Sequence, residues 1–168
     1  MRTLLALCLL LPALAVAETA MSSADFIAQA AADAIAEVEA GRMAQSTATA
    51  APPVQQLGRQ IGVEAVQKHE RLVQLAESRG LHLGNQISAS DRATLERLSR
   101  LRGAAFSRDY LRHVMAALEH QRALFQVAQV LDDHALSQFA RDSLPTIENQ
   151  LMVARAVYDS QIAGMPDR

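Results

Sequence analysis

Residues 106–125 read FSRDYLRHVMAALEHQRALF, and they form the longest well-patterned stretch of the sequence. On a helix of 3.6 residues per turn, the apolar side chains of this stretch fall on one broad stripe, which other helices must cover. The stripe consists of Phe106, Tyr110, Val114, Ala117, Leu118, Leu124 and Phe125. The stretch therefore predicts a long central helix around which the rest of the chain packs.

The same stretch holds two of the five histidines. Asp109, His113 and His120 line up along one margin of the apolar stripe. A carboxylate and two imidazoles in one row can form a metal site or an acid/base site, but polar side chains also border the apolar face of any surface helix. The row is a candidate site, with a solvated helix edge as its alternative.

The first seventeen residues, MRTLLALCLLLPALAVA, have the three parts of a secretory signal. Arg2 is followed by an apolar run over residues 4–14 and by an A-x-A arrangement that ends at Ala17. The run is shorter than the roughly 20 residues of a membrane span. We expect cleavage after Ala17 and a periplasmic product without a transmembrane segment. A lipoprotein anchored through Cys8, the only cysteine, is a weaker alternative because the apolar run continues past it.

The composition favours one all-α domain over residues 18–163. Hydrophobic residues make up 50% of the 168-residue chain, but only 4% of the residues are aromatic and none is tryptophan. The apolar content is mostly Ala, Leu and Val, which suits close packing of helices. The formal net charge is -2, and no cluster of basic and aromatic residues indicates a nucleic-acid partner. The partner of such a protein, its ligand and its oligomeric state stay open.

Two long helices are predicted before residue 80. Ser22 and Asp25 form a capping box for an Ala-rich helix over residues 23–46, and a small-residue connection ending in two prolines follows. A second helix is predicted over residues 54–79, with Gly80 as its C-terminal stop. The apolar positions at helical spacing are Phe26, Ile27, Ile35, Val38 and Met43 in the first helix, and Val54, Gly58, Ile61, Ala65, Leu72 and Ala76 in the second.

A long crossover and a short helix are predicted next. Residues 81–90 form a loop that is longer than the usual connection between bundle helices. Ser88, Ser90 and Asp91 then offer caps for a short helix that runs to Leu101.

The second half of the chain predicts the last two long helices. Gly103 marks a break before the central helix, which should end near Asp132 and Asp133, where the carboxylates suit the cap of the next helix. Pro145 must bend or restart the last helix, because proline removes one backbone donor. The tail at residues 164–168 is expected to be frayed.

Motifs for catalytic chemistry are missing from the sequence. No glutamate is followed three residues later by histidine, the pattern that ferritin-like two-metal centres need on two helices. The sequence also has no G-x-S-x-G elbow and no phosphate-binding glycine loop. We expect no catalytic residue and no cofactor.

A different metal site is the alternative. His69 lies on the core-facing side of the second helix, four residues after Ala65. Together with Asp109, His113 and His120 it offers ligand types that suit zinc, copper or iron. These residues are scattered over two helices, and a core-facing histidine more often hydrogen-bonds to a neighbour.

Several segments between residues 24 and 157 share the layout of a known family. They are AEVEAGRMA at 36–44, LVQLAESRGLHL at 72–83, the spacing of Gly103, Phe106 and Tyr110, ALF at 123–125, and FARDSLPTIENQL at 139–151. Together they resemble the exported bacterial proteins of domain of unknown function 4142 (DUF4142). The resemblance implies a ferritin-like four-helix bundle with a long crossover loop and a short extra helix before the third long helix.

The sequence departs from this family where the resemblance implies three histidines. The matching positions hold Ala65, Leu118 and Gln150, whereas Glu39 matches the acidic position of the first helix. The resemblance therefore supports the fold and the compartment more than an activity. We expect a non-enzymatic envelope binding or stress-related module. A metal-binding or oxidoreductase-like ferritin relative with rearranged histidine and aspartate ligands is the second hypothesis.

Overall fold

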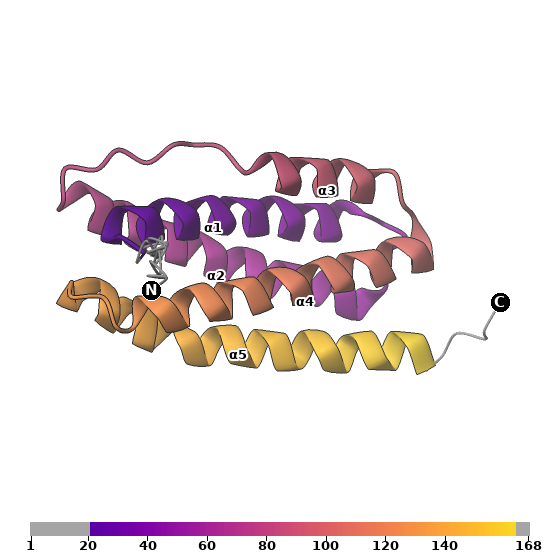
Figure 1. Ribbon diagram of the computed structural model, residues 1–168. Helices are drawn as coiled ribbons and strands as arrows, with labels where there is room; N and C mark the ends of the chain where they lie inside the picture. The colour runs from indigo at the N-terminus through magenta and orange to yellow at the C-terminus, as the bar shows by residue number, and fades with distance from the viewer. Residues whose placement is uncertain (1–20, 164–168) are drawn as a thin grey trace, which may run out of the picture.

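A computed structural model describes residues 21–163, and within this range the chain forms five helices and no strand (Figure 1). The all-α prediction is confirmed. The predicted signal peptide and the tail at residues 164–168 lie outside the described residues. The helices are α1 (Ser23–Ser46), α2 (Pro52–Glu77), α3 (Ala89–Ser99), α4 (Gly103–Ala128) and α5 (His134–Ala163). None of them, in the part of the chain described, is long and apolar enough to cross a bilayer.

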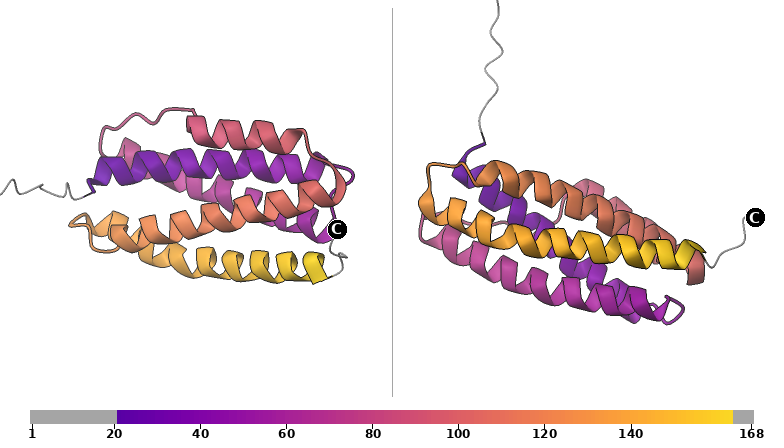
Figure 2. Two further views of the ribbon diagram at one scale, coloured as in Figure 1. Left: turned by 45° about the vertical axis from the view of Figure 1, so that its right-hand side comes forward. Right: turned by 90° about the horizontal axis from the view of Figure 1, so that it is seen from below.

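The four long helices lie side by side as two antiparallel pairs (Figures 1 and 2). One pair is α1 with α2 and the other is α4 with α5, while α1 also packs on α4 and α2 on α5. The connection from α2 to α4 runs back along the whole assembly, so that α2 and α4 point in the same direction (Figure 1). The short helix α3 lies on this connection and packs against α1 and α4. It therefore places its N-terminal end beside a seam between two long helices.

The helix ends are set by the cap residues that the sequence indicates. Ser22 and Asp25 form the capping box of α1, and the Ser88 hydroxyl accepts from a backbone amide of α3. Gly80 and Gly103 have φ values of 66° and 56°, a conformation that glycine adopts without strain. The Asp133 carboxylate accepts from the backbone N–H of the third residue after it, in the first turn of α5.

Three predicted boundaries need correction. Helix α2 begins at Pro52, two residues earlier than predicted, because a proline fits the first turn of a helix, where its missing N–H has no intrahelical partner. The central helix ends at Ala128 and does not reach Asp132. Of the two alternatives predicted at Pro145, a bend or a restart, the structure excludes the restart, because α5 is continuous from His134 to Ala163.

The core is built mainly from aliphatic and aromatic side chains of α2, α4 and α5. The predicted face of α2 is buried throughout, and in α4 the side chains of Phe106, Tyr110, Leu118 and Phe125 are at most 1% exposed. The aromatic rings of Phe26 and Phe125 meet edge to face at 5.2 Å between centroids. The stripe that defines the central helix is thus the side of α4 that the other helices cover.

The buried face of α1 is not the one that its larger side chains predict. Phe26 and Ile27 are fully buried as predicted, but Ile35, Val38 and Met43 are only half-buried, and beyond Ile27 the buried positions are alanines, Glu37 and Gly41. Gly41 lies directly against Gly58 of α2: a Cβ built on Gly41 would be 2.5 Å from the Gly58 carbonyl oxygen. The two backbones approach too closely for large side chains between them, so the helix turns its small residues inward.

Candidate functional site

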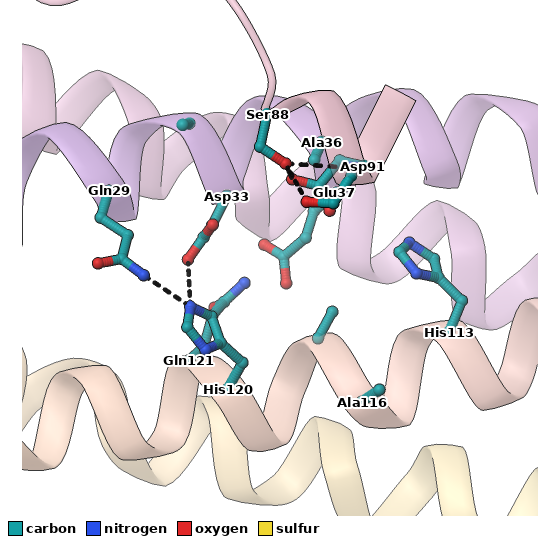
Figure 3. Close-up of a pocket in the computed structure, with 13 residues that line it drawn as sticks. Gln29, Asp33, Ala36, Glu37, Ser88, Asp91, His113, Ala116, His120 and Gln121 are labelled. Carbon is teal, nitrogen blue, oxygen red and sulfur yellow. Dashed lines mark hydrogen bonds and ion pairs between the residues drawn. The ribbon is translucent and has the colours of Figure 1, made fainter. Parts of the chain in front are cut away.

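A groove of about 460 Å³ lies between α1, α4 and the N-terminal end of α3 (Figure 3). Its polar lining comes from all three helices and the N-cap of α3: Gln29, Asp33, Glu37, Ser88, Ser90, Asp91, His113, His120 and Gln121. Its apolar walls are alanines, namely Ala32, Ala36, Ala116 and Ala117. Because alanine leaves space where a larger side chain would fill the seam, the alanine-rich sequence of α1 opens the groove.

Behind this groove, on the α2 side of Glu37 and Gln121, a largely buried ammonium group joins three helices. Lys68 Nζ on α2 donates to Glu37 Oε2 on α1 at 2.7 Å and to Gln121 Oε1 on α4 at 2.6 Å. The side chains of Lys68 and Glu37 are only 12% and 8% exposed. Each charge therefore depends on the other, because a buried charge without a partner strongly destabilises a fold.

Three buried polar atoms around this ion pair have no hydrogen-bond partner among the described residues: Asp33 Oδ2, Glu37 Oε1 and Gln121 Nε2. Figure 3 shows the Asp33 and Glu37 carboxylates pointing into the space between α1 and α4. Leaving a buried donor or acceptor unpaired costs about 1–3 kcal/mol. These two acceptors and one donor have almost no exposed surface, so a molecule in the groove pairs with them only when the side chains that cover them shift.

His120 approaches Asp33 but does not satisfy it. The Gln29 side-chain amide donates to His120 Nε2 at 2.8 Å, and the same nitrogen lies 3.7 Å from Asp33 Oδ2. A neutral imidazole nitrogen that accepts from Gln29 has no proton to donate to Asp33. Burial of the carboxyl outweighs the attraction of His120 and raises the pKa of Asp33 to about 6.

Because this pKa lies above its unfolded value, we expect Asp33→Asn to stabilise the protein at neutral pH. The folded state binds the Asp33 proton more tightly than the unfolded state, so stability falls as pH rises from about 4 to 6 and stays low above that range. The asparagine variant should exceed the wild type by about 2 kcal/mol at pH 7.5 and by almost nothing at pH 4. Urea unfolding at both pH values measures this difference.

The matched control is Glu39→Gln, which neutralises an exposed carboxylate on the same helix. Its unfolding free energy should stay within about 0.5 kcal/mol of the wild type, as for other surface substitutions. An asparagine variant that is less stable than the wild type at pH 7.5 would show that Asp33 is not a buried, unpaired carboxylate.

The four residues considered as candidate metal ligands do not come together as one group. His69 is half-buried and lines a groove under the crossover, together with His82, so it does not point into the core as expected. Asp109 forms an ion pair with Arg97 of α3 at 2.7 Å. No group of three or more His, Cys, Asp or Glu side chains within residues 21–163 can hold a metal ion.

The other two candidates, His113 and His120, do meet at one site. Both line the α1–α3–α4 groove, His113 toward one end and His120 beside Asp33 (Figure 3). Burial lowers the pKa of His113, so this imidazole is neutral at pH 7. Of the predicted row along α4, His113 and His120 thus line a polar groove, whereas Asp109 pairs with Arg97.

Four polar residues in and behind the groove were not predicted from the sequence: Asp33, Glu37, Lys68 and Gln121. Their signal in the sequence is the spacing of two carboxylates four residues apart in an alanine-rich helix, which places both on one face. The acidic residue singled out instead, Glu39, is exposed.

The positions where the resemblance implies histidines are all buried. Ala65 and Leu118 are each 1% exposed, and Gln150, at 3%, donates to Glu64. Lys68 and Gln121 each lie three residues beyond one of the first two positions, about one helical turn along. The hydrogen bond from the Lys68 ammonium to the Gln121 amide oxygen therefore lies about one helical turn from Ala65 and Leu118.

Comparison with known proteins gives one family. The model of the family described as "Domain of unknown function (DUF4142)" matches residues 10–157. No curated protein and no solved structure gave a significant match.

Proposed function

Because the chain belongs to the DUF4142 family, whose description assigns no reaction, we propose a function that rests on its groove. The protein is a non-enzymatic binding module of the bacterial envelope, and the α1–α3–α4 groove is its binding site. The observation that carries this proposal is the set of unpaired buried polar atoms of Asp33, Glu37 and Gln121 on the groove floor. A ligand that pairs with them gains hydrogen bonds that the free protein lacks.

The shape and lining of the groove support small-molecule binding. Its volume of about 460 Å³ lies within the range of roughly 300–1,000 Å³ that is usual for ligand sites. Alanine walls with a few polar groups at the floor are the usual composition of such sites. The nucleophile, base and orienting group that a hydrolytic site needs are not arranged together here, which favours binding over catalysis.

We also propose a ferritin-like bundle and export to the periplasm. The ferritin-like assignment is supported by two antiparallel helix pairs and one long crossover. Export is supported by the charged, apolar and A-x-A parts of the first seventeen residues. If both hold, full-length protein expressed in bacteria is recovered from the periplasmic fraction with a mass that begins at Glu18. Recovery of uncleaved protein from the cytoplasm would contradict export.

Closing the groove should abolish ligand binding without unfolding the protein. Ala116 is an exposed residue of the groove wall, so Ala116→Phe fills the space without disturbing the core. We expect saturation-transfer NMR with a fragment library of cations, anions and neutral compounds to give hits on the wild type. The variant should lose them.

The matched control is Ala156→Phe, the same change at an exposed alanine of α5 that does not line the groove. This control should keep every hit. If no fragment of any charge binds the wild type, or if Ala116→Phe retains the hits, the groove is not the functional site.

A further inference from the structure

We propose that the ligand of the groove is a small organic cation with primary ammonium groups on a short aliphatic chain. The inference rests on the proposed function, because it names the class of molecule that enters the same groove. It follows from the charge, the unpaired atoms and the walls of the groove.

The groove has an excess of negative charge. The carboxylates of Asp33, Glu37 and Asp91 line it, and no lysine or arginine of the described residues does. The Lys68 ammonium lies behind the groove and is already held by Glu37 and Gln121. His113 and His120 add no fixed positive charge when neutral. A cation entering the groove is attracted, whereas an anion meets carboxylates in a partly buried setting, where charges are weakly screened.

The contacts of Lys68 show that Glu37 and Gln121 can bind a primary ammonium group. Lys68 is a primary ammonium on an aliphatic stem, and it binds one oxygen of Glu37 and the amide oxygen of Gln121. The second Glu37 oxygen is buried and has no partner among the described residues, and Figure 3 shows the Glu37 carboxylate directed toward the space between α1 and α4. Glu37 as a whole is only 7% exposed, so a donor from the groove reaches this oxygen when the side chains around it shift.

The spacing of the carboxylates suits two ammonium groups. Asp33 and Glu37 are four residues apart on α1, which places their side chains next to each other on one helix face. Ala32, Ala36 and Ala117 supply apolar surface for the methylene groups of a ligand that spans both carboxylates. A short aliphatic diammonium compound matches this arrangement of two acceptors along an apolar wall.

Calorimetric titration of the full mature chain with putrescine tests the proposal, and succinate serves as a probe of the same length and opposite charge. We expect putrescine to bind at pH 7.5 and succinate not to bind. Asp33→Asn should weaken putrescine binding about tenfold, because a hydrogen bond to a charged group is lost. This variant is expected to be more stable than the wild type, so loss of binding in it is not a loss of folding.

Two further variants sharpen the assignment. Glu37→Gln removes the second carboxylate but also the charged partner of Lys68, so its folding is first checked by circular dichroism and urea unfolding. The folded variant should bind putrescine about tenfold more weakly. Glu39→Gln makes the same chemical change two residues away, at an exposed position outside the groove, and should leave the affinity within about twofold.

The affinity should also fall as the pH is lowered to 5. The groups that face Asp33 are Glu37 on its own helix, Lys68 on α2, Asp91 on α3 and His120 on α4. Protonation of Asp33 removes the charge that attracts the ligand, so binding weakens as the pH falls. We expect about a tenfold loss between pH 7.5 and 5 in the wild type and a smaller loss in Asp33→Asn.

Three outcomes would overturn this inference. They are binding of succinate in preference to putrescine, unchanged putrescine affinity in Asp33→Asn, and binding of zinc chloride more tightly than putrescine. The first leaves the groove as a binding site with a different ligand class, and Ala116→Phe would still abolish succinate binding. If neither probe nor any fragment binds, the proposed function itself fails.

Discussion

Replacing Gly41 by valine will lower the free energy of unfolding by at least about 3 kcal/mol, the upper part of the range for overpacking a core. The added Cβ would lie 2.5 Å from the Gly58 carbonyl oxygen and 3.2 Å from the Gly62 Cα atom. Both atoms belong to the backbone of α2, which has no rotamer to change. The helices must separate, and the buried alanines of α1 then lose their contacts with α2.

The matched control is Gly62→Ala on the opposite side of the same contact. A Cβ at Gly62 would lie 3.8 Å from the Gly41 Cα atom, an ordinary van der Waals distance. Alanine is favoured over glycine within a helix by about 1 kcal/mol, so this variant should be as stable as the wild type or slightly more stable. Urea unfolding followed by circular dichroism measures both. Equal stability of Gly41→Val and the wild type would show that α1 and α2 are not in close contact.

Replacing Lys68 by methionine will destabilise the protein by about 3 kcal/mol, because it leaves Glu37 buried without its partner. Methionine keeps the length of the aliphatic stem and removes the charge and the two hydrogen bonds. These bonds tie α2 to α1 and α4. The loss should appear as a lower urea midpoint at pH 7.5.

The double variant Lys68→Met with Glu37→Gln separates the charge effect from the packing effect. Because it removes the unpaired charge, the double variant should recover at least about 1 kcal/mol relative to Lys68→Met alone. A control at Arg59, an exposed basic residue of α2, should change stability by less than about 0.5 kcal/mol on replacement with methionine. Additive losses in the double variant would show that Lys68 and Glu37 do not interact.

The helices and their ends were predictable because the signals are local. Ser22 with Asp25, Ser88, Gly80 and Gly103 each act within a few residues, and the structure shows each of them at a helix end. The apolar stripe of the central helix also predicted its buried face. The face of α1 was predicted less well, since its burial depends on Gly58 in another helix.

The candidate site was predicted only in part. His113 and His120 were identified, and both line the groove, but His69 and Asp109 lie elsewhere. Asp33 and Glu37 looked like ordinary polar residues of an amphipathic helix. The place of these two carboxylates in the site depends on contacts with other helices, such as the pairing of Glu37 with Lys68, and on burial. Neither can be inferred from the sequence of α1 alone.

The sequence by itself determined that this chain is helical, which cap residues lie at several helix ends, and which family it belongs to. These properties follow from periodicity, caps and motifs, which act over short distances along the chain. Only the tertiary structure decided that Glu37, Lys68 and Gln121 meet, and that a groove with unpaired carboxylate oxygens opens beside them. The reason is that burial and charge pairing depend on the neighbours supplied by other helices, and the packing of α1 against α2, α3 and α4 sets those neighbours.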